Sequence, residues 1–257
     1  MAKIVHLSQK QNEQLKGKSD KEIALAAARR AMEEARRNRH INEPEQLASG
    51  KSYENGDMVI AEEAIYRIHH DENYLMHVIP PVESMDKLGA EHGTFAFNAE
   101  PKKYAEVWQP LHIEFAACTG KKTKAIPDVS ENFGRLFLSQ KAYSVLKELL
   151  ASSGEFLPVT YGEAGQGHIF NPLLTAEQLS AIDDKLTTHD QYGNLESFGF
   201  VEKKLKDTAI FKTQLDTFKG IFCNEEIKQA CEAENLTGIS FHPDVANPIG
   251  EAYGTEQ

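Results

Sequence analysis

Apolar positions in the second half of the chain change from strand-like to helical spacing and back. The run Leu136-Phe-Leu138 predicts a short buried strand, and Ser139 follows where a helix N-cap is expected. An apolar stripe then recurs at helical spacing as far as Gly154, a candidate C′ glycine. This stripe consists of Ala142, Leu146, Leu149 and Leu150. Residues 155–159 predict the returning strand, so the segment forms a strand–helix–strand unit.

The same order of signals recurs near the C-terminal end. Ile221-Phe-Cys223 predicts a strand, Asn224 an N-cap, 225–234 a helix and 236–241 a returning strand. The inward positions of this helix are Ile227, Ala230 and Cys231. The recurrence fits either a weak internal repeat or the commonest arrangement of αβ proteins, and we favour the latter.

Shorter periodic runs predict the remaining elements. A helix is expected over 175–186, opened by the capping box Thr175-Ala-Glu-Gln178. Strands are expected, from their β-branched and aromatic content, at 58–60, 65–68, 74–79, 94–98, 111–117, 197–202 and 208–212.

The N-terminal segment has a different character. Ser19-Asp-Lys-Glu22 is a capping box that predicts a helix over 19–40, whose second half is rich in arginine. This helix is either a solvated surface helix or an arm that docks a partner. Residues 41–57 predict a linker and a turn. We therefore expect a helical segment at 1–44 and a single α+β (mixed α/β) domain at 45–257, with short strands and a few helices packed on a sheet.

Charge is distributed unevenly along the 257 residues, whose net charge is −11. Residues 1–40 hold ten basic and five acidic residues. That leaves 18 of the 28 basic and 34 of the 39 acidic residues for 41–257, a balance of −16. A body this acidic repels nucleic acid and anionic membranes, so neither is expected as a partner, whereas a basic protein would be attracted.

Compartment and membrane signals point to the cytoplasm. No run approaches the roughly 18 to 20 apolar residues of a membrane span, and no secretory signal follows Met1. Cys118, Cys223 and Cys231 form no Cys-x-x-Cys motif and no even disulfide set. Reduced thiols are therefore expected, with Cys223 and Cys231 buried and inert.

No catalytic, metal or cofactor motif is complete. The run His69-His70-Asp71-Glu72, with His77 nearby, lacks the i, i+4 spacing of metal-binding helices, so we expect structural or surface roles. The glycines of 162–167 have the wrong spacing for a dinucleotide fingerprint and predict a hairpin loop. Trp108 is either a core anchor or an interface residue. We expect no enzyme, metal or cofactor, although a Ser-His-Asp set that converges only in space stays open.

Several motifs together resemble the "immunity protein 11" family of bacterial polymorphic-toxin systems. They are Ile126-Pro-Asp128, the runs 136–142, 154–158 and 168–172, Phe211-Lys212, and the runs 221–224 and 236–241. The resemblance spans residues 108–241. It implies an immunity protein, a cytoplasmic antitoxin that neutralises a cognate toxin by stoichiometric occlusion, and it supplies no catalytic residues.

An acidic antitoxin would suit a basic, nuclease-like toxin. We expect the partner-binding residues to include Asp183, Asp184 and Asp190, and the alternative is an ordinary solvated loop. Two other functions stay open. One is an adaptor or chaperone that uses the basic helix 19–40 to dock a secreted effector, and the other is a hydrolase with a His/Asp site.

Overall fold

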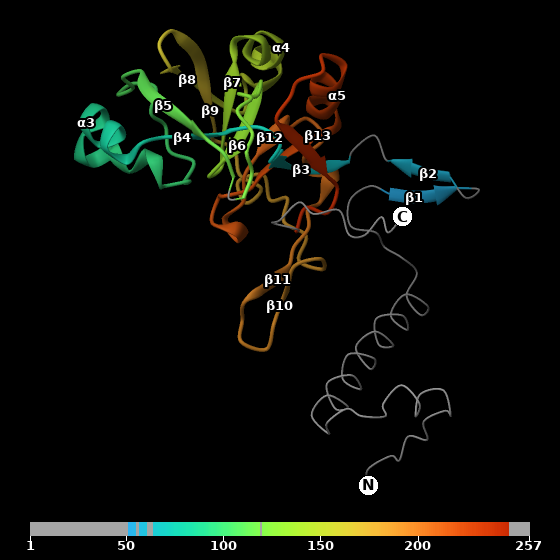
Figure 1. Ribbon diagram of the computed structural model, residues 1–257. Coiled ribbons are helices and arrows are strands. Elements are labelled where there is room, and N and C mark those ends of the chain that lie inside the picture. The colour runs from blue at the N-terminus through green and yellow to red at the C-terminus, as the bar shows by residue number, and fades with distance from the viewer. Residues whose placement is uncertain (1–50, 55–56, 61–63, 119, 247–257) are drawn as a thin grey trace, which may run out of the picture. The chain divides into compact units, whose positions relative to one another are not determined.

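The computed structural model describes residues 51–54, 57–60, 64–118 and 120–246, all of which belong to the unit Leu47–Gln257. The predicted helix over 19–40 and the helical segment 1–44 lie outside the described residues, and the boundary at residue 44 stays a prediction. The described chain is α+β, as predicted (Figure 1). No helix in these ranges is both long and apolar enough to cross a membrane.

Two small hairpins form two-stranded sheets of their own. Strands β1 (Lys51–Glu54) and β2 (Asp57–Ile60) pair antiparallel, as do β10 (Thr188–His189) and β11 (Leu195–Ser197). The β10–β11 hairpin extends away from the larger sheets (Figure 1).

A mixed six-stranded sheet forms the larger part of the body. Its order is β4-β5-β8-β9-β7-β6, and among the described strands of this sheet β5 and β8 are the only neighbours that pair in parallel. Its strands are β4 (Met76–Val78), β5 (Leu111–Ala116), β6 (Val129–Asn132), β7 (Arg135–Ser139), β8 (Gly154–Tyr161) and β9 (Gly165–Pro172). Helix α3 (Pro81–His92) and the 3₁₀ turn η1 (Gly93–Ala96) connect β4 to β5.

A four-stranded antiparallel sheet forms the rest, in the order β12-β13-β3-β14. Its strands are β3 (Ile65–His70), β12 (Ile210–Phe211), β13 (Ile221–Asn224) and β14 (Ile239–His242). The 3₁₀ turns η2 (Glu202–Lys204) and η3 (Gln214–Asp216) lie in the connections around β12.

The two strand–helix–strand units are confirmed, together with their caps. The Ser139 hydroxyl accepts a hydrogen bond from Ala142 N at the start of α4 (Gln140–Leu150), and the Asn224 side chain accepts one from Ile227 N in α5 (Glu225–Ala233). Gly154 was expected as the C′ residue of α4, but this prediction is wrong, because the C-cap of α4 is Ala151 and Gly154 already begins β8.

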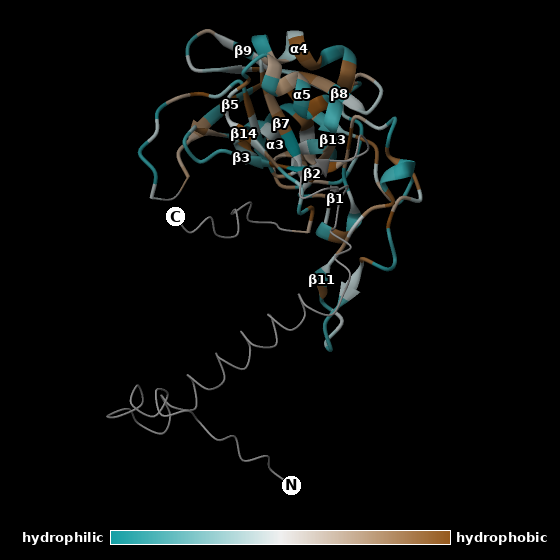
Figure 2. Cartoon of the chain, turned by 90° about the vertical axis from the view of Figure 1, so that its right-hand side faces the viewer, coloured by the Kyte–Doolittle hydropathy of each residue, from teal (hydrophilic) through white to brown (hydrophobic). Residues whose placement is uncertain are grey.

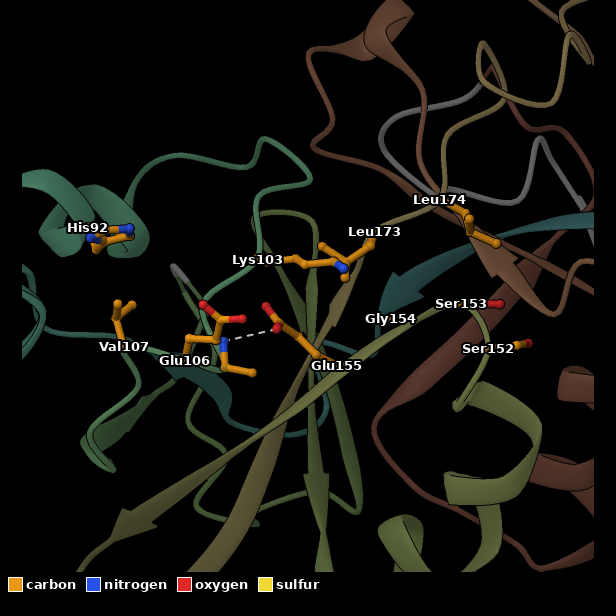
Figure 3. Close-up of a pocket in the computed structure, with 11 residues that line it drawn as sticks. His92, Lys103, Glu106, Val107, Ser152, Ser153, Gly154, Glu155, Leu173 and Leu174 are labelled. Atoms are coloured by element: carbon orange, nitrogen blue, oxygen red, sulfur yellow. Dashed lines mark hydrogen bonds between the residues drawn. The ribbon is translucent and has the colours of Figure 1, made fainter.

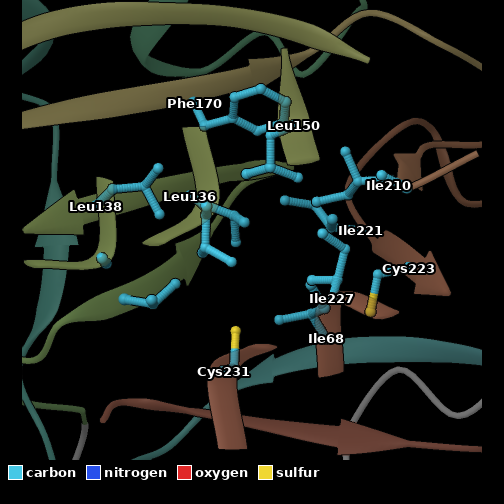
Figure 4. Packing of buried hydrophobic residues seen from close by; sticks show 14 of the residues in the cluster. Ile68, Leu136, Leu138, Leu150, Phe170, Ile210, Ile221, Cys223, Ile227 and Cys231 are labelled. Atoms are coloured by element: carbon cyan, nitrogen blue, oxygen red, sulfur yellow. The ribbon is translucent and has the colours of Figure 1, made fainter. Parts of the chain in front are cut away.

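The main core lies between these units (Figure 4). Leu136 and Leu138 of β7 point into a cluster that also contains Ile221 and Ile227, and α4 contacts α5 there. Phe137 faces the opposite side of the six-stranded sheet, into a second cluster with Phe95 and other residues. This alternation follows from the two-residue period of a strand, and it lets one sheet bury both of its faces.

The predicted helix over 175–186 is wrong. The capping box itself forms, because Thr175 N donates to Gln178 Oε1 and Gln178 N donates to Thr175 Oγ1. The chain then reverses at Ser180, whose φ is 51°, and Ala176 and Ala181 are buried on either side of the reversal. The capping bonds depend only on neighbouring residues, whereas the path of the chain beyond them is decided by tertiary packing, which here buries Ala176 and Ala181.

The predicted strand at 94–98 is also wrong, since this segment begins in the 3₁₀ turn η1. Of the run 197–202, only the end of β11 and a single bridge from Phe200 to Ile182 are extended pairings. Strand β6 and helix α3 were not predicted. Pro81 occupies the first turn of α3, where proline is favoured.

Candidate functional site

The predicted acidic residues lie on one surface segment, between residue 183 and the tip of the β10–β11 hairpin. Asp183 is partly buried and accepts a hydrogen bond from Lys185 N at 2.8 Å, which shapes the local turn. Asp184 is exposed. Of these two neighbouring carboxylates, Asp184 is therefore the one exposed to a partner, because Asp183 stabilises the turn.

Asp190 organises the hairpin tip. Its Oδ1 accepts hydrogen bonds from Tyr192 N and Asn194 N, and its Oδ2 accepts one from Asn194 Nδ2, all at 2.8–2.9 Å. These bonds, led by the one from the Asn194 side chain, lower the pKa of Asp190. Tyr192 is 80% exposed beside it, on a tip that is otherwise hydrophilic (Figure 2). The carboxylate of Asp190 is thus held in a fixed position within the turn and does not rotate freely.

A pocket of about 640 Å³ lies next to the start of β8 (Figure 3). Its central carboxylate, Glu155, accepts hydrogen bonds from Tyr104 N, Ala105 N and Asn171 Nδ2 at 2.8–3.0 Å. Glu155 therefore fastens the 99–110 connection to the sheet. His92 and Ser153 line opposite ends of the pocket with Glu155 between them, so they do not form a nucleophile–base pair (Figure 3).

A serine–histidine pair does occur, but it is sealed inside the fold. His77 Nδ1 lies 3.1 Å from Ser130 Oγ, and the two residues are 1% and 0% exposed. Burial lowers the pKa of His77 to about 3. The ring is thus a neutral structural group without access to a substrate. Within the described ranges, no group of three or more His, Cys, Asp or Glu side chains is placed to hold a metal ion.

Two further predictions from single residues are decided here. Cys223 and Cys231 are buried, and burial raises the pKa of Cys231 to about 12, so neither thiol is a ready nucleophile. Trp108 is half-buried, donates from Nε1 to the Pro158 carbonyl at 2.9 Å and packs edge-to-face on Phe95. Trp108 therefore anchors the core rather than a surface.

A second concave site, which we call the aromatic groove, has a volume of about 760 Å³. Three phenylalanines from separate segments line it: Phe97 after η1, Phe133 in the β6–β7 turn and Phe218 after η3. Phe97 is 54% exposed and Phe133 is 37% exposed. The sequence did not predict this groove. One local signal was present, the pair Phe133-Gly134 just before the strand predicted at 136–138.

Comparison with known proteins gives the family. The family model described as "Immunity protein family (Imm11)" matches residues 64–246. The chain belongs to this family. No curated protein sequence matches the chain.

The Imm11 match begins well before the region in which the motifs were recognised. It starts next to β3, the strand that pairs with both β13 and β14. The four-stranded sheet cannot form without β3, so the family region has to include it. The match also covers the aromatic groove and the acidic segment.

Buried charged side chains of this Imm11 fold donate hydrogen bonds to the backbone that lines the aromatic groove. Arg135 Nη2 donates to the Asn98 carbonyl at 2.7 Å, and Lys212 Nζ donates to the Ala99 carbonyl at 2.9 Å. Both side chains are fully buried, and burial lowers the pKa of each. The backbone directly after Phe97 is thereby held by groups whose loss would leave unsatisfied carbonyls.

A salt bridge completes this support. Arg67 Nη2 lies 3.1 Å from Asp216 Oδ2, which also accepts from Gly220 N. Glu131 also interacts with Arg67. Burial raises the pKa of Glu131 to about 7, although the charge of Arg67 acts to lower it. The loop from Asp216 to Gly220 is therefore tied to the central strand β3, on which Arg67 lies.

Proposed function

We propose that this Imm11 chain is a cytoplasmic antitoxin that binds the toxin of its own system and neutralises it by stoichiometric occlusion, without catalysis. The observation that carries the proposal is the family match over 64–246. The charge of −16 on residues 41–257 supports a basic toxin, such as a nuclease, because opposite charges accelerate association.

The chemistry of the described residues gives the hydrolase alternative no support. The hydrogen-bonded Ser–His pair is buried, and the carboxylate of the 640 Å³ pocket is occupied by backbone donors. The adaptor alternative depends on the helix predicted for 19–40, outside the described ranges.

Co-expression tests the function directly. The C-terminal domain of a toxin encoded in the adjacent reading frame should stop the growth of a naive host, and this chain should restore it by forming a one-to-one complex. Unrestored growth, with both proteins present, would contradict the proposal.

We place Asp183, Asp184 and Asp190 at the rim of the toxin interface. Charge reversal at Asp184, which is exposed, should weaken binding by more than about 1 kcal/mol, roughly fivefold. The matched variant Asp190→Asn keeps an acceptor for Tyr192 N and Asn194 N but removes the charge. If calorimetry shows the affinity unchanged in both variants, the segment is an ordinary solvated loop.

A further inference from the structure

The aromatic groove contains a residue choice that local structure opposes. Strands β6 and β7 are joined by a two-residue turn, Phe133-Gly134, with φ values of 52° and 72°. Two positive φ values are typical of a type I′ turn, for which Asn-Gly is the favoured sequence. Phenylalanine is disfavoured in the left-handed region, and here its ring is partly exposed rather than needed in the core.

The facing segment shows the same feature. Thr217 and Phe218, consecutive non-glycine residues, have φ values of 59° and 62°. A Cβ on Gly134 would collide with the Phe218 carbonyl oxygen, so the two segments meet backbone to backbone. This close approach places Phe133 and Phe218 on one groove. Unfavourable backbone conformations persist where the surrounding structure enforces them, and they gather at binding sites.

The groove is preformed. Arg135 and Lys212 hold the carbonyls of Asn98 and Ala99, next to Phe97, and the Arg67–Asp216 bridge holds the segment that carries Phe218. A partner that binds here would meet an ordered surface, so little conformational entropy would be lost on binding. Exposed aromatic rings on rigid supports are typical of the residues that dominate protein interfaces.

The charges of the groove indicate what it binds. Lys219 Nζ already lies 5.7 Å from the centre of the Phe133 ring, so a cation is accepted on this aromatic face. Phe97 is more exposed than Phe133, and Glu100, an exposed acidic residue three positions after Phe97, lines the same groove. An arginine can stack on a ring while its fork donates to a carboxylate.

We infer that the aromatic groove is the anchor site for an arginine side chain of the basic toxin, stacked on Phe97 beside Glu100. This inference rests on the proposed function and goes further, because it assigns the main binding contribution to the groove rather than to the acidic segment. The acidic body, with its balance of −16, steers such a basic protein towards the groove.

The test measures binding of the purified toxin domain encoded in the adjacent reading frame, by calorimetry, together with thermal unfolding of each variant. Phe97→Ala and Glu100→Gln should each weaken binding, the former at least tenfold. Phe133→Asn should weaken binding while raising the melting temperature by about 2–4 °C, because asparagine suits the turn. A purely structural Phe133 would instead lower the melting temperature when replaced. Val82→Ala, which truncates a 71% exposed apolar residue on α3, is the matched control and should bind as wild type.

The outcomes separate the two proposals. Tight binding by the wild type that is unchanged in Phe97→Ala and Phe133→Asn overturns the groove and leaves the antitoxin function intact. A wild type that does not bind the toxin overturns both. A wild-type dimer that dissociates in Phe97→Ala, with toxin affinity unchanged, assigns the groove to a second copy of this chain and also overturns the inference.

Discussion

The two strand–helix–strand units have the same internal arrangement but obtain their middle strand from different places. In the first, β7 and β8 are parallel and separated by β9, which is antiparallel to both. In the second, β13 and β14 are parallel and separated by β3, again antiparallel to both. The outer strands also correspond, since β6 pairs with β7 as β12 pairs with β13.

The difference lies in the order of the chain. Strand β9 follows β8 directly through a tight turn, whereas β3 comes from the beginning of the described body. One unit is thus completed by a local hairpin, and the other by a strand, β3, that lies far from β13 and β14 in the sequence. Forming long-range pairs requires closing a long loop, so the second sheet is expected to assemble later than the first.

The strongest test of this comparison removes one isoleucine from each middle strand. Ile68 of β3 and Ile169 of β9 are both fully buried, so Ile68→Ala and Ile169→Ala should each cost about 2–5 kcal/mol of unfolding free energy. Denaturant titration measures this cost.

Kinetics then distinguishes the two strands. If the local hairpin forms first, Ile169→Ala should mainly slow folding, whereas Ile68→Ala should mainly accelerate unfolding. Stopped-flow chevrons with the two effects reversed would show that the second sheet forms first.

A fall in pH sharpens the comparison, because each sheet contains a histidine that is buried, as His77 is, or partly buried, as His69 is. Burial lowers the pKa of His77, in β4, to about 3 and that of His69, in β3, to about 4, from about 6.5 in the unfolded chain. Below about 6.5 the unfolded state therefore binds more protons than the folded state. Stability is lost as the pH falls, by at most about 1.4 kcal/mol per pH unit for each ring.

The pH range over which stability is lost should be wider for the histidine of the six-stranded sheet than for that of the four-stranded sheet. The contribution of His77 is lost down to about pH 3, and that of His69 only down to about pH 4. Melting temperatures between pH 7 and 4 should fall less steeply in His77→Gln and in His69→Gln than in the wild type. Equal slopes in all three proteins would refute the assignment.

The smallest expected effect compares the caps of the two helices. Asn224→Ala removes only the bond to Ile227 N and should cost about 1 kcal/mol. Ser139→Ala should cost more, because the Ser139 hydroxyl also donates to Asp128 Oδ1 at 3.1 Å. Asn224→Asp, which keeps a capping oxygen, is the control. Thermal unfolding that gives the same loss for both alanine variants would show that the bond to Asp128 adds nothing.

The acidic segment and the aromatic groove differ in how visible they are in the sequence. The acidic segment is visible in the sequence because its aspartates lie close together. The hydrogen bonds by which Asp190 stabilises its own turn could not be predicted from the sequence. Phe97, Phe133 and Phe218 lie tens of residues apart and follow no shared period, so their convergence depends on the packing of β6, β7 and η3.

By itself the sequence determined the helices α4 and α5, their caps, the strands around them and the resemblance to immunity proteins. These features depend on residues within a few positions of one another, where periodicity and hydrogen-bonding side chains act directly. It also specified the capping box at Thr175, which forms although no helix follows. Tertiary structure alone decided that β3 lies between β13 and β14, that His77 and Lys212 are buried, and that three phenylalanines share a groove. Such outcomes depend on which distant surfaces exclude water together, and that is a property of the folded chain rather than of any short segment.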